Sequence, residues 1–112
     1  MNKKMRSIIV DDEESARDVL SALLHRYHSE IEVIDKCTNV EEAVSSIKKY
    51  NPELIFLDIE MPRFAGYEIL NFFENVDFKI IFVTAYDQYA IKAFELAALD
   101  YLLKPIDPDR LA

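Results

Sequence analysis

The sequence predicts an α/β domain in which a parallel β-sheet is covered by helices on both faces. Short apolar runs alternate with segments of helical periodicity, and this alternation requires crossover connections between parallel strands. The runs are nearly continuous in apolar residues, as strands buried on both faces of a sheet need to be. With 112 residues, 51% of them hydrophobic, the chain has the size and composition of a single domain spanning residues 1–112.

The first half of the chain is expected to contribute three strands and two helices. Residues 8–10 form the first strand, and residues 31–34 form a shorter and more polar strand that suits a sheet edge. Asn39 predicts the N-cap of the second helix, and Asn51, followed by a proline, should end it. Leu54–Leu57 is an uninterrupted apolar strand. Helical spacing in the first helix is carried by Ala16, Val19, Leu20, Leu23, Leu24 and Tyr27.

The second half continues the alternation. Helical patterns are expected over residues 67–73 and 88–96, and strands over residues 80–83 and 101–103. Asp107 and the proline after it have the pattern of an N-cap and first helical turn. A fifth helix is therefore predicted there, and it is truncated because the sequence reaches its last residue about one turn later.

Composition limits the partners of this chain. It has 13 basic and 21 acidic residues and a net charge of −8, which disfavours direct binding to nucleic acid or to an anionic membrane. The single cysteine, Cys37, allows no intramolecular disulfide and is expected in the core. No apolar run approaches the ~18 residues of a membrane span, and the N-terminal run is too short for a signal peptide. A cytoplasmic location is expected.

Polar side chains follow four of the predicted strands. Asp11 and Asp12 follow the first, Asp58 the third, Thr84 ends the fourth, and Lys104 follows the fifth. Because ligands bind beyond the carboxyl ends of such strands, these residues should gather at one edge. Aspartates crowded there repel one another and raise at least one pKa, unless a divalent cation is bound. Oxygen donors without histidine or cysteine favour Mg²⁺, and with a lysine and a hydroxyl they suit phosphoryl transfer to aspartate.

Each of these residues also has an ordinary structural interpretation. The acidic "DDEES" segment suits a helix start, Asp58 could be a turn residue, and Lys104 could lie in a solvated loop. Their occurrence together at successive strand ends favours a functional site. His25 and His28 fall late in the first predicted helix, far from this edge, and are expected at the surface or at the helix end.

The segments "IIVDDEE", "LIFLDIEMP", "VTAY" and "DYLLKP", in this order and spacing, resemble the receiver domain of two-component response regulators. The resemblance covers essentially the whole chain. It implies a flavodoxin-like, doubly wound, five-stranded parallel sheet with strand order 2-1-3-4-5. The longer segment "VTAYDQYAIKAFELAALDYLLKPI" is similar to the receivers of the LytTR branch, the LytR/AgrA type, in which a LytTR DNA-binding domain usually follows.

The resemblance also assigns roles to individual residues. It implies that Asp58 accepts a phosphoryl group from a sensor histidine kinase. Asp12 and Asp58 would ligate Mg²⁺ directly, together with the backbone carbonyl of Glu60, and Asp11 would act largely through a metal-bound water. Lys104 would pair with the phosphoryl oxygens.

Thr84 and Tyr101 match the switch positions of the family. The resemblance implies that Thr84 bonds the phosphoryl group and that Tyr101 responds to it, leading to a homodimer and to transcription regulation. DNA would be contacted only through a C-terminal output domain that is not present in this chain, and no membrane contact is expected. The chain would be a phosphoacceptor rather than an enzyme with its own substrate. Pro62 and Gly66 fit the loop after the acceptor.

Three alternative functions are compatible with parts of the pattern. A haloacid-dehalogenase-like aspartyl-phosphate phosphatase would use an acid–x–acid loop, which Asp58 and Glu60 weakly resemble. A flavodoxin-like FMN module would need a phosphate loop after the first strand, where this chain has aspartates. A phosphorylation-independent interaction scaffold would not need intact Asp58, Thr84 and Lys104.

Overall fold

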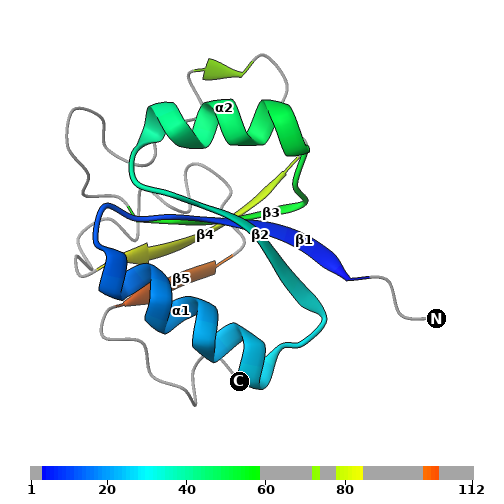
Figure 1. Ribbon diagram of the computed structural model, residues 1–112, viewed down its shortest axis with the longest axis vertical. Helices are drawn as coiled ribbons and strands as arrows, with labels where there is room; N and C mark the ends of the chain where they lie inside the picture. The colour runs from blue at the N-terminus through cyan, green and yellow to red at the C-terminus, as the bar shows by residue number, and fades with distance from the viewer. Residues whose placement is uncertain (1–3, 59–71, 74–77, 85–99, 104–112) are drawn as a thin grey trace.

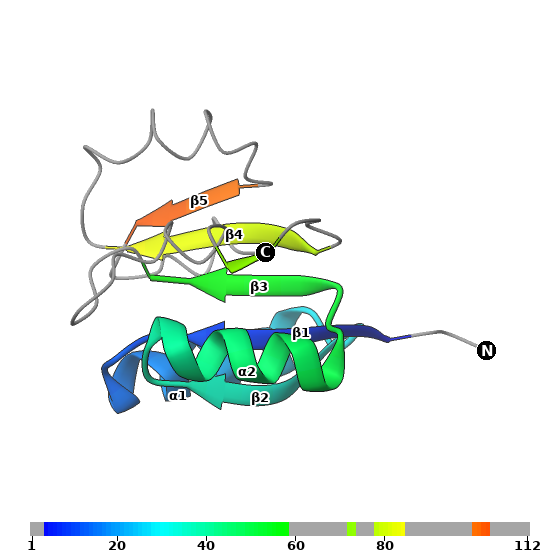
Figure 2. The same ribbon diagram turned by 90° about the horizontal axis from the view of Figure 1, so that it is seen from above.

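The computed structural model is an α/β domain and confirms the predicted fold class (Figure 1). It describes residues 4–58, 72–73, 78–84 and 100–103, with the backbone alone at 84 and 100–103. Five parallel strands form one sheet in the order β2-β1-β3-β4-β5, as predicted (Figure 2). Helix α1 covers one face of this sheet and α2 covers the other (Figure 1).

The described elements follow the predicted order. They are β1 Met5–Val10, α1 Glu14–Tyr27, β2 Ile31–Cys37, α2 Val40–Tyr50, β3 Leu54–Leu57, β4 Lys79–Thr84 and β5 Asp100–Leu103. The first two strands are longer than predicted, because backbone pairing extends beyond their apolar runs. The predicted helices over 67–73 and 88–96 and the predicted fifth helix lie outside the described residues, apart from 72–73.

Both predicted ends of α2 are confirmed by its capping geometry. The Asn39 side chain accepts a hydrogen bond from the Glu42 amide at 2.8 Å, which satisfies a first-turn donor. Asn51 ends the helix in the left-handed region, at φ 50° and ψ 59°, where asparagine is tolerated better than most residues. The Asn51 amide still donates to the Ile47 carbonyl at 2.9 Å, so the helix closes without losing that bond.

The core is divided by the sheet into two layers. Ile8, Val10, Ile55 and Leu57 face α2, whereas the intervening strand residues face α1. The layer beneath α2 also contains Cys37, Val40, Ala43, Ile47, Phe78, Ile80 and Phe82. The layer beneath α1 contains Ile9, Leu20, Leu24, Leu54, Phe56 and Val83. Strands β1 and β3 therefore lie at the buried centre of the domain, as their continuous apolar runs indicated.

The edge strand β2 contains a β-bulge at Ile34. Ser7 pairs with Val33 and the next residue of β1 pairs with Asp35, so Ile34 is the extra residue. The bulge reverses the alternation of side chains along β2. Val33 packs beneath α1, whereas Ile34 packs beneath α2 and Asp35 reaches Ser46 on the same helix. Because of this reversal, the end of β2 presents Cys37 to the α2 layer.

Cys37 is buried, as predicted for a core residue. Burial, together with the nearby Asp35 charge, raises the pKa of its thiol to about 12. The thiolate that would act as a nucleophile is therefore disfavoured. Among the described residues, no helix is both long and apolar enough to cross a membrane.

Candidate functional site

Strands β1 and β3 place two buried aspartates beside each other at the carboxyl edge of the sheet. Val10 pairs with Leu57, and the Asp58 amide donates to the Val10 carbonyl at 2.9 Å. Asp11 and Asp58 thus follow paired residues on adjacent strands, which lie about 4.8 Å apart in a sheet. Asp11 is 4% exposed and Asp58 is 5% exposed. Burying two carboxylates at neighbouring positions is costly unless hydrogen bonds or cations compensate.

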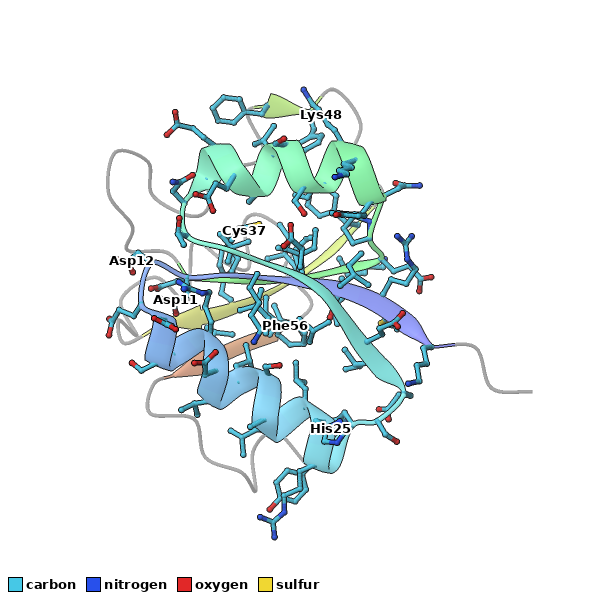
Figure 3. The ribbon with its side chains drawn as sticks, in the orientation of Figure 1. Asp11, Asp12, His25, Cys37, Lys48 and Phe56 are labelled. Atoms are coloured by element: carbon cyan, nitrogen blue, oxygen red, sulfur yellow. The ribbon has the colours of Figure 1, made fainter. Side chains whose placement is uncertain are left out.

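The acidic loop, residues 11–13, connects β1 to α1 and brings three carboxylates together. One carboxylate oxygen from each of Asp11, Asp12 and Glu13 lies within 4.8 Å of the other two. Asp12 and Glu13 are exposed, so this group opens to solvent from the buried Asp11 outward. The Glu13 amide donates to Asp11 Oδ1 at 3.0 Å, which turns the chain sharply before α1 begins. Figure 3 shows Asp11 and Asp12 at the start of α1.

Desolvation and like charge in the acidic loop both act on Asp12. Partial desolvation of its carboxylate, and then the charge of the neighbouring Asp11, raise the pKa of Asp12 above its ordinary value. A raised pKa was expected from the crowded aspartates at this edge, and the charge of Asp11 contributes to it as the second cause, after desolvation. Oxygen ligands of this kind match the coordination preference of Mg²⁺, and a bound cation would relieve the repulsion.

A basic side chain from α1 also contacts the acidic loop. Arg17 Nη1 donates to the backbone carbonyl of Asp11 at 2.7 Å, and the Arg17 amide donates to the Glu13 carbonyl at 3.2 Å. The guanidinium therefore binds the backbone of the loop through a short, charge-assisted hydrogen bond.

The sheet also places the backbone of two other predicted site residues, Thr84 and Tyr101. Thr84 ends β4, the neighbour of β3, and pairs with Leu103 at the end of β5. Tyr101 lies on β5 and pairs with Phe82. The side chains of Thr84 and Tyr101, and the whole of Glu60 and Lys104, lie outside the described residues. The sheet thus brings the backbone of Thr84 to the same edge as Asp58.

Sequence reasoning missed two residues of this edge. Glu13 was considered only as part of an acidic helix start, although its carboxylate joins those of Asp11 and Asp12. The signal was available, because an aspartate two residues before a helix N-cap favours the turn that brings their groups together. Arg17 was not singled out, and its position one helical turn after the loop was the available signal.

The histidines take no part in this edge. His25 lies at the far end of α1 from Asp11 and Asp12, and it is exposed (Figure 3). His28 forms the C-cap of α1, and its Nδ1 lies 3.0 Å from Glu30 Oε1. Their predicted place at the surface and the helix end is confirmed.

This arrangement of strands and carboxylates agrees with the comparisons with known proteins. The chain matches the response regulator receiver domain family over residues 8–112. It belongs to that family. Acidic residues at the carboxyl ends of β1 and β3 are therefore those of a signalling receiver domain.

Individual relatives support the same assignment. The receiver domain is 49% identical over 109 residues to a response regulatory protein of Yersinia pestis, covering 96% of this chain and 45% of that protein. It is 45% identical over 108 residues to the transcriptional regulatory protein BtsR of Escherichia coli K12, with coverage of 96% and 45%. The receiver domain thus spans about half the length of these curated relatives.

A solved structure supports the fold. The response regulatory domain of mrkE from Klebsiella pneumoniae superposes with a TM-score of 0.86 at 34% sequence identity. The match covers 96% of this chain and 88% of that one. The receiver fold extends in this comparison over nearly the whole sequence.

Proposed function

We propose that this receiver domain is a phosphorylation-activated switch that accepts a phosphoryl group on Asp58 in a Mg²⁺-dependent reaction. The observation that carries the proposal is the position of two buried carboxylates, Asp11 and Asp58, each directly after a paired residue at the end of a central strand. Phosphoryl transfer needs little covalent chemistry from a protein beyond positioning and charge neutralisation. A central strand with neighbours on both sides provides such rigid positioning for Asp58.

The proposed metal site uses the acidic edge, which consists of Asp11, Asp12, Glu13 and Asp58 at the carboxyl ends of β1 and β3. Asp12, Asp58 and the Glu60 carbonyl would bind Mg²⁺ directly, and Asp11 would contribute largely through a water. When bound, Mg²⁺ neutralises the charge of the carboxylates and of the incoming phosphoryl oxygens. Support comes from the raised pKa of Asp12 and from the closeness of the loop carboxylates, an arrangement that a bound cation would stabilise.

Each polar group would have a separate role in the reaction. An Asp58 oxygen forms the new bond to phosphorus while the bond to the donor breaks, and the donor leaves with the electron pair. Lys104 would pair with the phosphoryl oxygens, and Thr84 would donate a hydrogen bond to one of them. The place of Thr84 at the end of β4, next to β3, supports its role.

The proposed output passes through Tyr101 on the edge strand β5. Movement of Thr84 toward the phosphoryl group would leave space into which Tyr101 turns, and a two-state side chain of this kind amplifies a small shift. In the intact protein this would promote a homodimer. Tyr101→Ala should leave labelling of Asp58 nearly unchanged and uncouple it from dimerisation of the full-length protein, measured by analytical ultracentrifugation. Phosphorylation-dependent dimerisation equal to wild type would contradict the switch role.

The partners follow from the family and remain proposals for this chain. A sensor histidine kinase would supply the phosphoryl group. The similarity to BtsR, a transcriptional regulatory protein, supports control of transcription by the longer protein. We propose an output domain of the LytTR type, on the basis of the segment from residue 83 to residue 106. DNA would be bound by that domain rather than by this acidic chain.

The decisive experiment is intact-mass spectrometry after incubation with acetyl phosphate. One phosphoryl group should be added with Mg²⁺ and none after chelation with EDTA. Asp58→Asn should abolish the addition, because the amide is a poor nucleophile. Asp35→Asn is the matched control, since Asp35 is a partly buried strand aspartate outside the acidic edge.

Other outcomes would favour the alternative functions. Unchanged labelling of Asp58→Asn would remove the acceptor role. A complete lack of labelling in the wild type would favour an interaction scaffold, and catalytic turnover of free phosphate esters would favour a phosphatase of the haloacid dehalogenase type.

A further inference from the structure

Arg17 contacts the acidic loop through a backbone carbonyl rather than through a carboxylate oxygen. The pairing of β1 with β2 and β3 ends at Val10, so the Asp11 carbonyl lies one residue past the last ladder pair. Arg17 Nη1 donates to this carbonyl at 2.7 Å. The guanidinium thus brings a positive charge to a crowded acidic segment through the backbone, where it does not compete with a cation for carboxylate ligands.

The contact also fixes the direction in which the loop leaves the sheet. A peptide unit is planar, so holding the Asp11 carbonyl holds the plane that links Asp11 to Asp12. Within the same loop, the Glu13 amide donates to Asp11 Oδ1 at 3.0 Å. Asp12 lies between the Asp11 carbonyl and the Glu13 amide that form these two hydrogen bonds. The direction of the Asp12 side chain therefore depends on both bonds.

The position of Arg17 on α1 explains why its side chain can reach the loop. Helix α1 begins at Glu14 after the N-cap Glu13, so Arg17 lies one turn inside the helix. Helical side chains tilt toward the N-terminus, which directs the guanidinium back over the loop. The Arg17 amide donates to the Glu13 carbonyl at 3.2 Å, so the same residue is bonded to both ends of the loop.

We propose that Arg17 is a positioning residue, which holds the acidic loop in the shape in which its carboxylates bind Mg²⁺. This inference rests on the Mg²⁺ site of the proposed function. Loss of a side chain that orients metal ligands typically weakens metal binding by about 10–100-fold. A cation that acted through charge alone would have the opposite effect, because its removal would strengthen the attraction between Mg²⁺ and the carboxylates.

The positioning role and a role through charge alone predict opposite changes in Mg²⁺ affinity when Arg17 is replaced, so one measurement distinguishes them. The Mg²⁺ dissociation constant of the unphosphorylated protein is measured by isothermal titration calorimetry for wild type, Arg17→Met and Arg17→Gln. We expect Arg17→Met, which keeps an apolar stem and removes the donor, to bind Mg²⁺ about tenfold more weakly. Arg17→Gln keeps a shorter, neutral donor, and we expect an intermediate loss of about threefold.

Arg26→Met is the matched control for net charge. It removes an arginine from the last turn of the same helix, where the Arg26 side chain is exposed and contacts the Tyr27 ring. Its Mg²⁺ dissociation constant should equal that of wild type. Thermal unfolding without Mg²⁺ identifies the temperature at which each variant is folded, and the titrations are made below it. A merely structural role would lower the melting temperature of Arg17→Met without changing its Mg²⁺ affinity.

Each result has one interpretation. Mg²⁺ binding to Arg17→Met that is unchanged or tighter, while wild type binds Mg²⁺, overturns the positioning role and leaves the metal site intact. If Arg17→Met does not fold, tighter or unchanged binding by Arg17→Gln overturns it in the same way. Failure of wild type itself to bind Mg²⁺ overturns the proposed metal site and, with it, this inference.

Discussion

Two regions of this domain place aspartates in different electrostatic surroundings. The acidic edge consists of Asp11, Asp12, Glu13 and Asp58. The Asp35 cluster consists of Asp35, Cys37 and Ser46, between β2 and α2. In the Asp35 cluster the carboxylate faces donors. Asp35 Oδ2 accepts from Ser46 Oγ at 2.7 Å and lies 3.9 Å from Cys37 Sγ, while Oδ1 accepts from the Lys36 amide at 2.9 Å.

At the acidic edge, three carboxylates also lie close to one another, although Asp11 Oδ1 accepts from the Glu13 amide. These carboxylates approach within 4.8 Å of one another, and the pKa of Asp12 is raised by desolvation and by Asp11. Hydroxyl and amide donors around a carboxylate can stabilise a fold, whereas like charge close to a carboxylate disfavours its ionised form and favours a bound cation. The Asp35 cluster therefore joins a helix to the sheet edge, and the acidic edge is suited to ligand binding. Four predictions test this difference, from the largest expected effect to the smallest.

Replacement of Asp12 should distinguish the acidic edge from the Asp35 cluster most clearly, through its effect on Mg²⁺ binding. Asp12→Ala is expected to weaken Mg²⁺ binding by at least about tenfold, because even groups that only orient metal ligands contribute that much. Asp35→Ala should leave Mg²⁺ binding unchanged. Isothermal titration calorimetry measures both variants against wild type. Equal losses in the two variants would show that the division between the regions is wrong.

Removal of the Ser46 hydroxyl should affect stability without affecting Mg²⁺. Ser46→Ala removes the 2.7 Å donor to Asp35, and leaving a partly buried acceptor without this buried donor costs about 1–2 kcal/mol. The melting temperature should fall by roughly 5–10 °C. Ser45→Ala is the control, because Ser45 is exposed on the same helix and should change stability little. A Ser46→Ala variant as stable as Ser45→Ala would argue against a structural role for the cluster.

The same Asp12→Ala change should stabilise the metal-free domain. It removes one charge from a repelling group, but Asp12 is exposed and solvent screens its interactions, so we expect only about 0.5 kcal/mol. The melting temperature without Mg²⁺ should rise by about 2–4 °C, and added Mg²⁺ should no longer raise it further. Differential scanning fluorimetry with and without EDTA gives both values. A lower melting temperature in EDTA would indicate that Asp12 stabilises the loop.

The smallest effect concerns pH. Because the folded-state pKa of Asp12 is raised, the native state holds this proton more tightly than the unfolded state. The contribution of Asp12 to stability is therefore lost as the pH rises from 3.8, the ordinary pKa of this group, through its raised folded-state pKa. In EDTA, the gain in unfolding free energy of Asp12→Ala over wild type should grow across this window. Urea denaturation at a series of pH values measures it, and a gain independent of pH would contradict the assigned cause.

Much of the fold could be predicted from the sequence because its signals are local. The apolar run Leu54–Leu57 and the caps at Asn39 and Asn51 depend on neighbouring residues, and the structure confirms them. The length of β2 could not be predicted, because residues 35–37 are polar or small and join the strand through pairing with β1. Backbone pairing between distant segments leaves little trace in a local hydrophobic pattern.

The same contrast between local signals and contacts formed on folding explains which residues of the candidate site were predicted. Asp11, Asp12 and Asp58 were found because they follow apolar strands, and the sheet edge brings strand ends together. Glu13 and Arg17 were missed because their contacts depend on the turn between β1 and α1, where Glu13 donates to Asp11 Oδ1 and Arg17 to the Asp11 carbonyl. The roles of Glu60, Thr84, Tyr101 and Lys104 remain predictions.

The bulge at Ile34 also has a consequence for self-association. An edge strand presents unpaired backbone groups that can extend the sheet into a second molecule. In β2 the bulge interrupts the regular spacing of such groups, and the exposed charges of Glu32 and Lys36 flank it. Both features make this edge a poor template for strand addition. Association of two copies by strand addition at β2 is therefore disfavoured.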